Sequence, residues 1–260
     1  MNNLSRSQLF QIADELKYLN LEIANSNCKK VNFKETFYTK YGKRTLDIII
    51  SLFAVAITLP INLIILIITF FDVGLPVFFK QERIGRNGNN FYIYKFRNMH
   101  DLRDSNGELL PASQRVTKWG RFVRKTSLDE LLCFFNVLKG DMSIIGPRPL
   151  VTTYYGRFNN RHIARFKVRP GLEMPPRDSF KSRTWEDQFE DDVWYIENIN
   201  FKTDLLLFFK LVKFVFNRKQ ASVRGSAVRG SFMGYNEEGE VIEEHNIPKE
   251  FVKRFESSEE

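Results

Sequence analysis

Cysteine and histidine are scarce in this sequence. Its 260 residues include two cysteines, Cys28 and Cys133, and three histidines. The two cysteines do not have the spacing of a metal site and cannot build a disulfide framework, so we expect a reducing compartment. His162 and His245 lack partners at metal-ligand spacing, and we expect both to be structural or surface residues.

The chain also lacks a recognisable secretory signal and a nucleic-acid-binding module. The first forty residues are polar, without the apolar core of a signal peptide. The formal charge is +8 and there are 25 phenylalanines, a combination that suits nucleic acid or an anionic membrane surface. Because the aromatic residues lie in apolar runs, we expect a lipid bilayer and no nucleic acid as a partner, and a nucleic-acid-binding protein is the weaker alternative.

Charged residues are absent between Asp47 and Asp72. The apolar run 48–71 has about the 20 residues that a membrane helix requires, and a buried core helix is the alternative. Pro60, in the middle of the run, predicts a bend. Both flanks are positive, with Lys40, Lys43 and Arg44 before the run and Lys80, Arg83 and Arg86 after it. The positive-inside rule then gives no orientation, so we favour a re-entrant helix that enters and leaves on the cytoplasmic side.

Sequence patterns predict one helix near the start of the chain, another near residue 210 and a hairpin after it. Apolar positions recur at helical spacing from Ser7 to about Ala24, and this N-terminal helix could pack on the body, lie on a membrane or pair with a partner. The apolar stretch 204–216 is too short to span a bilayer and predicts an interfacial helix, with a buried core helix as the alternative. Residues 233–242 predict a hairpin around Glu238-Gly239.

A first β-hairpin is predicted directly after the apolar run. Strand-like segments 76–83 and 91–97 flank the residues 85–90, in which Asn87-Gly88 is a strong turn pair. Four basic residues line this hairpin: Arg83, Arg86, Lys95 and Arg97. They form either a solvated face or an edge that faces phosphate groups near the membrane.

The stretch 126–149 contains the strongest candidate site. Ser127 and Glu130 have the spacing of a capping box, which predicts a helix over residues 128–138 ended by Gly140. Asp129 would then lie in the first turn, where the helix dipole favours an ionised carboxylate. Arg148 lies between two prolines, which predicts a rigid turn. Taken singly, these residues could be a cap, a surface acid and a surface arginine.

Several motifs, in their order, resemble those of the bacterial sugar transferases, the monotopic polyprenyl-phosphate phosphoglycosyl transferases. The resemblance extends from Lys43 to Phe216. Its motifs are Lys43-Arg44, Arg83-Ile84-Gly85, Tyr94-Lys95-Phe96-Arg97, Thr126-Ser127-Leu128-Asp129-Glu130-Leu131, Asn136-Val137-Leu138-Lys139-Gly140-Asp141, Gly146-Pro147-Arg148-Pro149 and Arg169-Pro170-Gly171. The chain of motifs is far more specific than any one of them.

The resemblance implies an α+β, mainly helical fold: a membrane-anchored, monotopic cytoplasmic domain with a re-entrant membrane helix and a small β-hairpin. It divides the chain into an N-terminal helical arm (1–40), the membrane helix (41–75), the catalytic domain (76–216) and a basic linker with an acidic tail (217–260). The protein would lie on the bacterial inner (cytoplasmic) membrane with its catalytic domain facing the cytoplasm, and a homodimer is left open.

The resemblance also implies a reaction. Such enzymes transfer a phospho-sugar from a UDP-sugar to polyprenyl (undecaprenyl) phosphate and thereby initiate surface polysaccharide or glycoconjugate assembly. Asp129 would be the nucleophile that forms an aspartyl intermediate, and Glu130 would help to hold Mg²⁺. The expected phosphate- or nucleotide-binding residues are Arg124, Arg148, Lys95 and Arg97.

Two segments depart from the family pattern. Leu132-Cys133 replaces the usual Pro-Gln after Leu131, and residues 172–183 lack the usual Thr-Gly and Gly-Arg elements. Arg177 or Arg183 could replace the missing arginine. These departures motivate an alternative, a catalytically inactive membrane-bound adaptor of a polysaccharide assembly complex.

Overall fold

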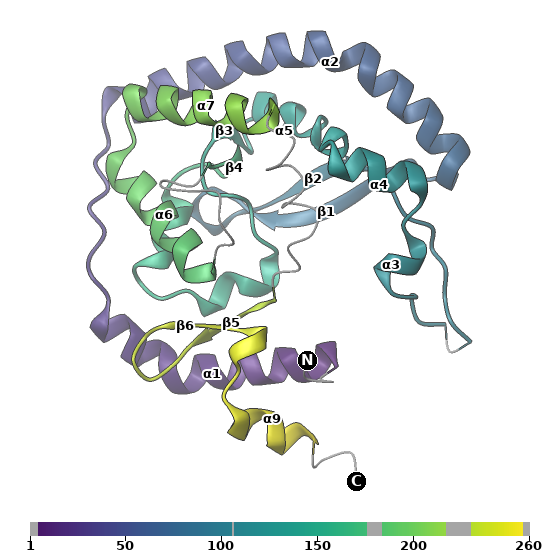
Figure 1. Cartoon of the computed structure of the whole chain (residues 1–260). Coiled ribbons are helices and arrows are strands. Elements are labelled where there is room, and N and C mark those ends of the chain that lie inside the picture. Colours follow the sequence, from purple (N-terminus) through teal and green to yellow (C-terminus); the bar gives the residue numbers. More distant parts are fainter. Residues whose placement is uncertain (1–4, 106, 176–183, 217–229, 257–260) are drawn as a thin grey trace.

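The computed structural model describes residues 5–105, 107–175, 184–216 and 230–256. Its fold is mainly helical with small sheets, as the sequence predicted (Figure 1). One long helix, α2 (Lys43–Val73), arches over a body built from the two-stranded hairpin β1–β2 and several shorter helices. Arg177 and Arg183 lie outside the described residues.

Helix α2 has both of its ends fastened to the same body. At its start, Lys43 Nζ lies 2.7 Å from Asp204 Oδ2 in α7 (Phe201–Phe216). At its end, Thr117 Oγ1 donates a hydrogen bond to Asp72 Oδ2 at 2.6 Å, and Arg97 donates to the carbonyl of Val73. The middle of α2, which includes Pro60, forms the arch between these two attachments (Figure 1).

The polarity of α2 is the reverse of that of a helix in a water-soluble protein. Polar side chains face the body, and Ser51 and Thr69 are completely buried there. Apolar side chains face outward, with Phe53 68% and Phe71 81% exposed. Among the described residues, this is the one helix long and apolar enough to cross a membrane by length and composition. An apolar exterior is favourable in lipid and unfavourable in water.

The predicted hairpin is confirmed. Strands β1 (Phe78–Ile84) and β2 (Asn90–Phe96) pair antiparallel, with Phe79 opposite Lys95. Asn87 in the turn has a φ of 57°, in the left-handed region that asparagine tolerates. Helices α3 (Ala112–Arg115) and α4 (Lys118–Lys125) follow, and Thr117 caps α4 by accepting a hydrogen bond from the Gly120 N–H.

The predicted capping box at Ser127 is wrong. Ser127 has a φ of 56° and its side chain makes no capping hydrogen bond, because a capping residue needs an extended backbone. Residues Leu128–Glu130 form a 3₁₀ turn instead, and the helix α5 (Cys133–Lys139) starts later than expected. Gly140 does end this helix, with a φ of 100°. Glu130 is therefore not occupied as a capping residue.

A short parallel pair of strands joins two segments from the middle of the chain. Strand β3 (Ser143–Ile145) pairs with β4 (Gly171–Glu173), and the backbones approach closely where the pair begins. A Cβ atom on Gly171 would lie 2.2 Å from the backbone nitrogen of Gly146, so only glycine fits there. This pairing brings the turn around Arg148 beside Glu173.

The main core lies between the hairpin and the helices below α2. It includes Phe91 and Ile93 from β2, Val137 from α5, and Tyr195 and Ile196 from α6 (Trp185–Asn198). A second cluster is rich in aromatic residues, among them Phe158, Phe166, Trp185, Phe189 and Phe232. The predicted helix at 204–216 corresponds to α7.

The two ends of the chain pack on each other. Helix α1 (Arg6–Asn27) lies against β5 (Phe232–Tyr235), which pairs antiparallel with β6 (Val241–Glu243), so the predicted second hairpin is confirmed. Helix α9 (Lys249–Glu256) completes this group. Of the three settings that the sequence left open for the N-terminal helix, the structure has it packed on the body (Figure 1).

Candidate active site

Asp129 and Glu130 lie in the 3₁₀ turn between α4 and α5, beneath α2. The turn packs against strand β2, which brings Lys95 of the hairpin beside the two acids. Asp129 is 7% exposed, whereas Glu130 is half-buried. The two neighbouring carboxylates therefore occupy different environments although they are adjacent in the chain.

Glu130 is shared by two cations. Its Oε1 accepts hydrogen bonds from Lys95 Nζ at 2.6 Å and from Arg148 Nη2 at 2.9 Å. The other end of the Arg148 guanidinium donates to Glu173 Oε2 at 3.0 Å. Glu130 and Glu173 together raise the pKa of Arg148, which stays charged. The site thus holds a lysine and an arginine in fixed positions beside Asp129.

Burial raises the pKa of Asp129 above its ordinary value. The cations of Lys95 and Arg124 oppose that shift, while the negative charge of Glu130 adds to it. The buried carboxylate is thus poorly solvated, and the flanking cations favour its ionised form. This is the environment expected for a nucleophilic carboxylate.

The structure brings together Asp129, Glu130, Lys95 and Arg148 of the residues predicted from the sequence. Arg124 lies in the last turn of α4, close enough to lower the pKa of Asp129. Arg97 is the exception. Its guanidinium contacts the carbonyl of Val73 and Asp101, so it fastens the end of α2 to the hairpin.

Cys133 lies close enough to both acids for their charges to act on its thiol. Burial and the charge of Glu130 raise the pKa of Cys133 to about 11. A thiol with that pKa is almost entirely protonated at neutral pH, and the protonated form is a poor nucleophile. The departure from the family pattern at this position therefore does not place an ionised thiol beside the two acids.

Residues that the sequence analysis missed hold the Arg148 turn rigid. Arg165 Nη2 donates to the carbonyl of Arg148 at 2.8 Å and pairs with Asp192 Oδ2 at 2.9 Å. Arg165 and Asp192 are almost completely buried. The Gly171 N–H donates to the carbonyl of Pro147 at 2.9 Å. Glu173 was missed as well, because its contact with Arg148 depends on the pairing of β3 with β4.

The donor set at Asp129 and Glu130 fits Mg²⁺. This ion takes one or two carboxylates together with phosphate oxygens and water. Glu130 already accepts from Lys95 and Arg148, so a Mg²⁺ ion would share this carboxylate with them. That arrangement suits an ion that arrives with a diphosphate.

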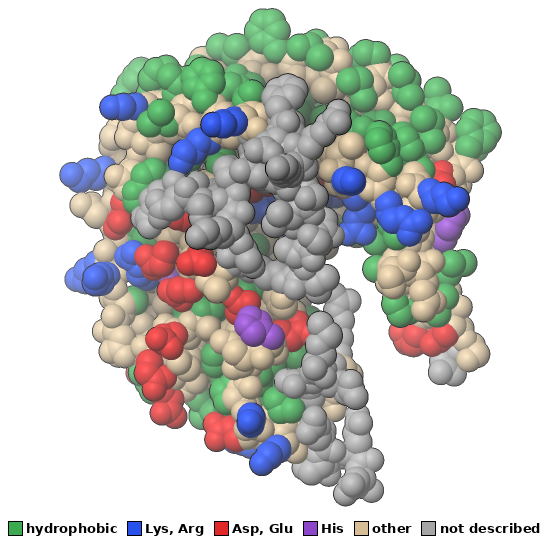
Figure 2. Space-filling view, in the orientation of Figure 1, with side chains coloured by type: hydrophobic (Ala, Val, Ile, Leu, Met, Phe, Trp, Pro, Cys, Tyr) green, Lys and Arg blue, Asp and Glu red, His purple; other side chains and the backbone are tan. Residues whose placement is uncertain are grey.

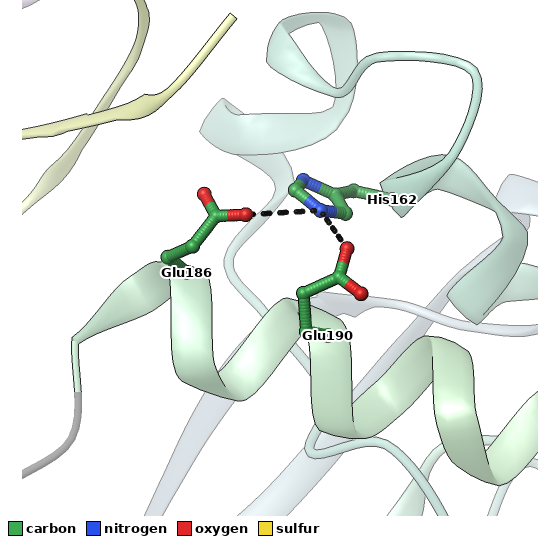
Figure 3. A group of neighbouring side chains, drawn as sticks. All are labelled: His162, Glu186 and Glu190. Carbon is green, nitrogen blue, oxygen red and sulfur yellow. Dashed lines mark hydrogen bonds and ion pairs between the residues drawn. The ribbon is translucent and has the colours of Figure 1, made fainter. Parts of the chain in front are cut away.

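A second group of metal-ligand types surrounds His162 (Figure 3). Glu186 and Glu190 project from α6 toward its ring, and Nε2 lies 3.1 Å from Glu190 Oε1. Arg161 holds both oxygens of Glu190, each at 2.6 Å, and helps to lower the pKa of Glu190 to about 2. Tyr235 lies 2.9 Å from Nδ1 on the other side of the ring. The group is a satisfied structural network, and His162 is buried as expected of a structural residue.

The chain belongs to the bacterial sugar transferase family, because the model of that family matches residues 38–218. This confirms the resemblance found in the sequence motifs. A sugar transferase is an enzyme that moves a sugar-containing group, and the matched region contains the whole Asp129 site, the hairpin and α2.

Three relatives illustrate the similarity. An uncharacterized sugar transferase, EpsL, of Bacillus subtilis is 43% identical over 63% of this chain and 81% of its own length. A UDP-N-acetylgalactosamine-undecaprenyl-phosphate N-acetylgalactosaminephosphotransferase of Aeromonas hydrophila is 34% identical over 66% of this chain and 43% of its own. An undecaprenyl-phosphate galactose phosphotransferase of Salmonella typhimurium is 33% identical over 70% and 42%. The chain thus spans less than half the length of the last two.

The buried pair of Arg165 and Asp192 leads to a stability prediction. Replacing Asp192→Ala leaves the Arg165 cation buried without its partner, which costs about 3–5 kcal/mol. We expect urea unfolding of the full chain in a neutral detergent to report that loss. The matched control is the double variant Arg165→Met, Asp192→Leu, which removes both charges and recovers most of the stability. A loss below about 1 kcal/mol for Asp192→Ala would contradict the role of this pair.

Proposed function

We propose that this protein transfers a phospho-sugar from a UDP-sugar to polyprenyl (undecaprenyl) phosphate, and so initiates assembly of a surface polysaccharide or glycoconjugate. The observation that carries the proposal is the buried Asp129 carboxylate beside Glu130, Lys95 and Arg148. The relatives support the same chemistry, since two of them are named as undecaprenyl-phosphate sugar phosphotransferases. Other relatives carry galactose or glucose in their names, so the particular sugar varies within the family.

In the first step, a carboxylate oxygen of Asp129 attacks the sugar-bearing phosphorus of the UDP-sugar. A P–O bond to aspartate forms, the diphosphate bond breaks, and UMP leaves with the bonding electron pair. Burial makes the attacking oxygen poorly solvated, while Arg124 and Lys95 favour its ionised form. Arg148 and Lys95 bind phosphate oxygens as charge moves onto the leaving group.

In the second step, an oxygen of polyprenyl phosphate attacks the same phosphorus. The acyl phosphate bond breaks, the Asp129 carboxylate is regenerated, and polyprenyl diphosphate sugar is released. Glu130 would help to hold Mg²⁺, which when bound neutralises charge on the diphosphate. Each step exchanges one P–O bond for another, so no oxidant or further co-reactant is needed.

The proposed acceptor is a lipid, which requires a site beside a membrane. Hydrophobic side chains gather on the upper face of the molecule over α2, and Lys and Arg side chains lie just below them (Figure 2). This distribution suits an apolar face in the hydrocarbon with cations at the level of the headgroups. With both ends of α2 fastened to one body, a re-entrant helix in the cytoplasmic leaflet of the inner membrane is the arrangement we favour.

An inactive adaptor is not favoured. The acidic pair and its cations are all present in the chain, and the charged contacts among them are made. The divergent loop lies mostly outside the described residues. Of its described part, Glu173 contributes directly by pairing with Arg148.

Release of UMP tests the proposed reaction. Purified protein incubated with UDP-sugars, polyprenyl phosphate and Mg²⁺ should release UMP. Asp129→Asn should lower the rate by about a thousandfold or more, because the amide is not a nucleophile for phosphorus. Asp14→Asn, at an exposed acid in α1, is the matched control and should keep the wild-type rate. Absence of UMP with every nucleotide sugar would exclude the proposed function.

The pH dependence of the first step tests the role of Lys95. The reaction needs ionised Asp129, so its rate should fall as the pH drops through the pKa of that residue, which lies above the ordinary aspartate value. Lys95→Met removes a cation that lowers this pKa, so the acid limb should move to higher pH.

Lys80→Met is the matched control, because this hairpin lysine lies over the ring of Tyr92, on the opposite face of the hairpin from Lys95. Its acid limb should coincide with that of the wild type. Single-turnover release of UMP measured across pH gives both profiles. An unmoved limb in Lys95→Met would show that this lysine does not act on the ionisation of Asp129.

Cysteine labelling tests the topology of α2. In a chain whose native cysteines are replaced by serine, Tyr41→Cys and Leu75→Cys introduce thiols at exposed positions on either side of the helix. A re-entrant helix predicts that a membrane-impermeant reagent labels both from the cytoplasmic side. Ile57→Cys, at an outward-facing position near the middle of α2, should stay unlabelled in lipid. Labelling of the two flanks from opposite sides would show that α2 crosses the membrane.

A further inference from the structure

A basic cavity lies at the start of α2. It has a volume of about 220 Å³. Six cationic side chains line it: Lys40, Lys43, Arg44, Arg86, Lys167 and Arg169. Two acidic side chains, Glu35 and Asp47, also line it, so positive charge is in excess.

Three of the six cations have partners within the protein. Lys43 pairs with Asp204, and Arg44 donates to the carbonyls of Val137 and Leu138 at the end of α5. Arg169 donates to the carbonyl of Gly140 at 2.7 Å. These contacts fix one wall of the cavity.

The other three cations have no ion-pair partner among the residues that the structure describes. Lys40 lies 5.5 Å from the ring centroid of Tyr41, and Lys167 lies 6.0 Å from that of Phe33. Arg86 comes from the turn of the β1–β2 hairpin. Three separate segments thus bring cations to one cavity with few acids to neutralise them.

The crowding of positive charge acts on Arg169. Burial, together with the charges of Arg44 and Arg86, lowers the pKa of its guanidinium. Cations held this close together repel one another unless an anion lies between them. An anionic ligand in the cavity would therefore be attracted by all of these cations at once.

Helix α5 separates this cavity from the acidic pair. Asp129 and Glu130 precede the helix, whereas Arg44 and Arg169 contact carbonyls at its other end. The helix has seven residues, which corresponds to a length of about 10 Å. The cavity therefore lies at the opposite end of α5 from the acidic pair.

Aromatic residues next to the cavity indicate where its ligand comes from. Phe37 is 80% exposed and Tyr41 is 54% exposed, and both immediately precede the apolar helix α2. Exposed aromatic residues at the end of a membrane helix lie at the level of the lipid headgroups. The cavity then opens where phosphate groups of lipids are abundant.

We propose that this cavity binds the phosphate group of an anionic ligand, with Lys40, Arg86 and Lys167 as the residues that close on it. The same chemistry is available from an anionic phospholipid headgroup and from a soluble phosphate ester. The site is independent of sugar transfer, since none of these three residues belongs to the Asp129 site.

The test compares two variants of the full chain in neutral detergent. One replaces the three cations, as Lys40→Gln, Arg86→Gln, Lys167→Gln. The matched control replaces three exposed lysines elsewhere, as Lys118→Gln, Lys202→Gln, Lys249→Gln, and changes the net charge equally. Binding of phosphatidylglycerol, of zwitterionic phosphatidylcholine and of glycerol phosphate is measured by native mass spectrometry and by the shift of the unfolding midpoint.

The wild type and the control should bind phosphatidylglycerol more tightly than phosphatidylcholine. The cavity variant should bind phosphatidylglycerol at least tenfold more weakly, since each charge-assisted contact accounts for about that factor. Glycerol phosphate separates the two sources. If the cavity variant loses affinity for glycerol phosphate and for phosphatidylglycerol equally, the phosphate group alone is recognised. If the wild type binds phosphatidylglycerol but not glycerol phosphate, the ligand is a membrane lipid.

Two results would overturn the proposal. One is that the cavity variant binds both anionic probes as tightly as the wild type. The other is that the control variant loses as much affinity as the cavity variant, which would mean general charge attraction. An unchanged unfolding midpoint without ligand shows that the variant folds; if it does not fold, Arg86→Gln alone should still weaken binding severalfold.

Discussion

A buried carboxylate, Asp204, determines how the apolar helix α2 is joined to the rest of the protein. Its Oδ2 accepts from Tyr38 at 2.5 Å and from Lys43 at 2.7 Å, and its Oδ1 accepts from Tyr195 at 2.7 Å. A buried charge is tolerated only when it is paired and hydrogen-bonded, and these three donors meet that requirement. Because the Tyr195 hydroxyl also lies 3.2 Å from the carbonyl oxygen of Ile145, the start of α2 is linked to the strand that leads to the Arg148 turn.

The candidate active site also depends on a buried charge that is paired. Arg165 and Asp192 form a buried pair that supports the backbone of Arg148, while the guanidinium of Arg148 stays accessible and holds Glu130. The buried ion pair thus holds the backbone of the site, and the half-exposed Arg148 and Glu130 are placed on it beside the buried Asp129. Cations already in position before a substrate binds need no reorganisation when charge develops during a reaction.

Local signals in the sequence predicted local structure well. Asn87-Gly88 predicted the hairpin because the turn needs two residues in the left-handed backbone region, which Asn and Gly adopt readily. Ser127 shows where such reasoning fails: the spacing to Glu130 suited a capping box, but Ser127 itself took the left-handed conformation. The contacts of Arg165 with Asp192 and of Arg148 with Glu173 join residues 25 or more positions apart. No short motif encodes them, because they depend on how α6 and the β3–β4 pair fold onto the body.

In the proposed re-entrant arrangement, the two attachments of α2 set the position of the site along the membrane normal. A polyprenyl phosphate has its reactive oxygen at the level of the headgroups, so a protein that uses it must hold its nucleophile at that height. In that arrangement the apolar outer face of the arched helix lies in the hydrocarbon, and both of its ends lie at the membrane surface. The hairpin that carries Lys95 follows one end, and the basic cavity lies at the other. In that arrangement, the helix that buries its polar side chains against the body also sets the height of the charged groups. Asp204 joins the start of this helix to the body, so it affects the position of the site although it lies far from Asp129 in the chain.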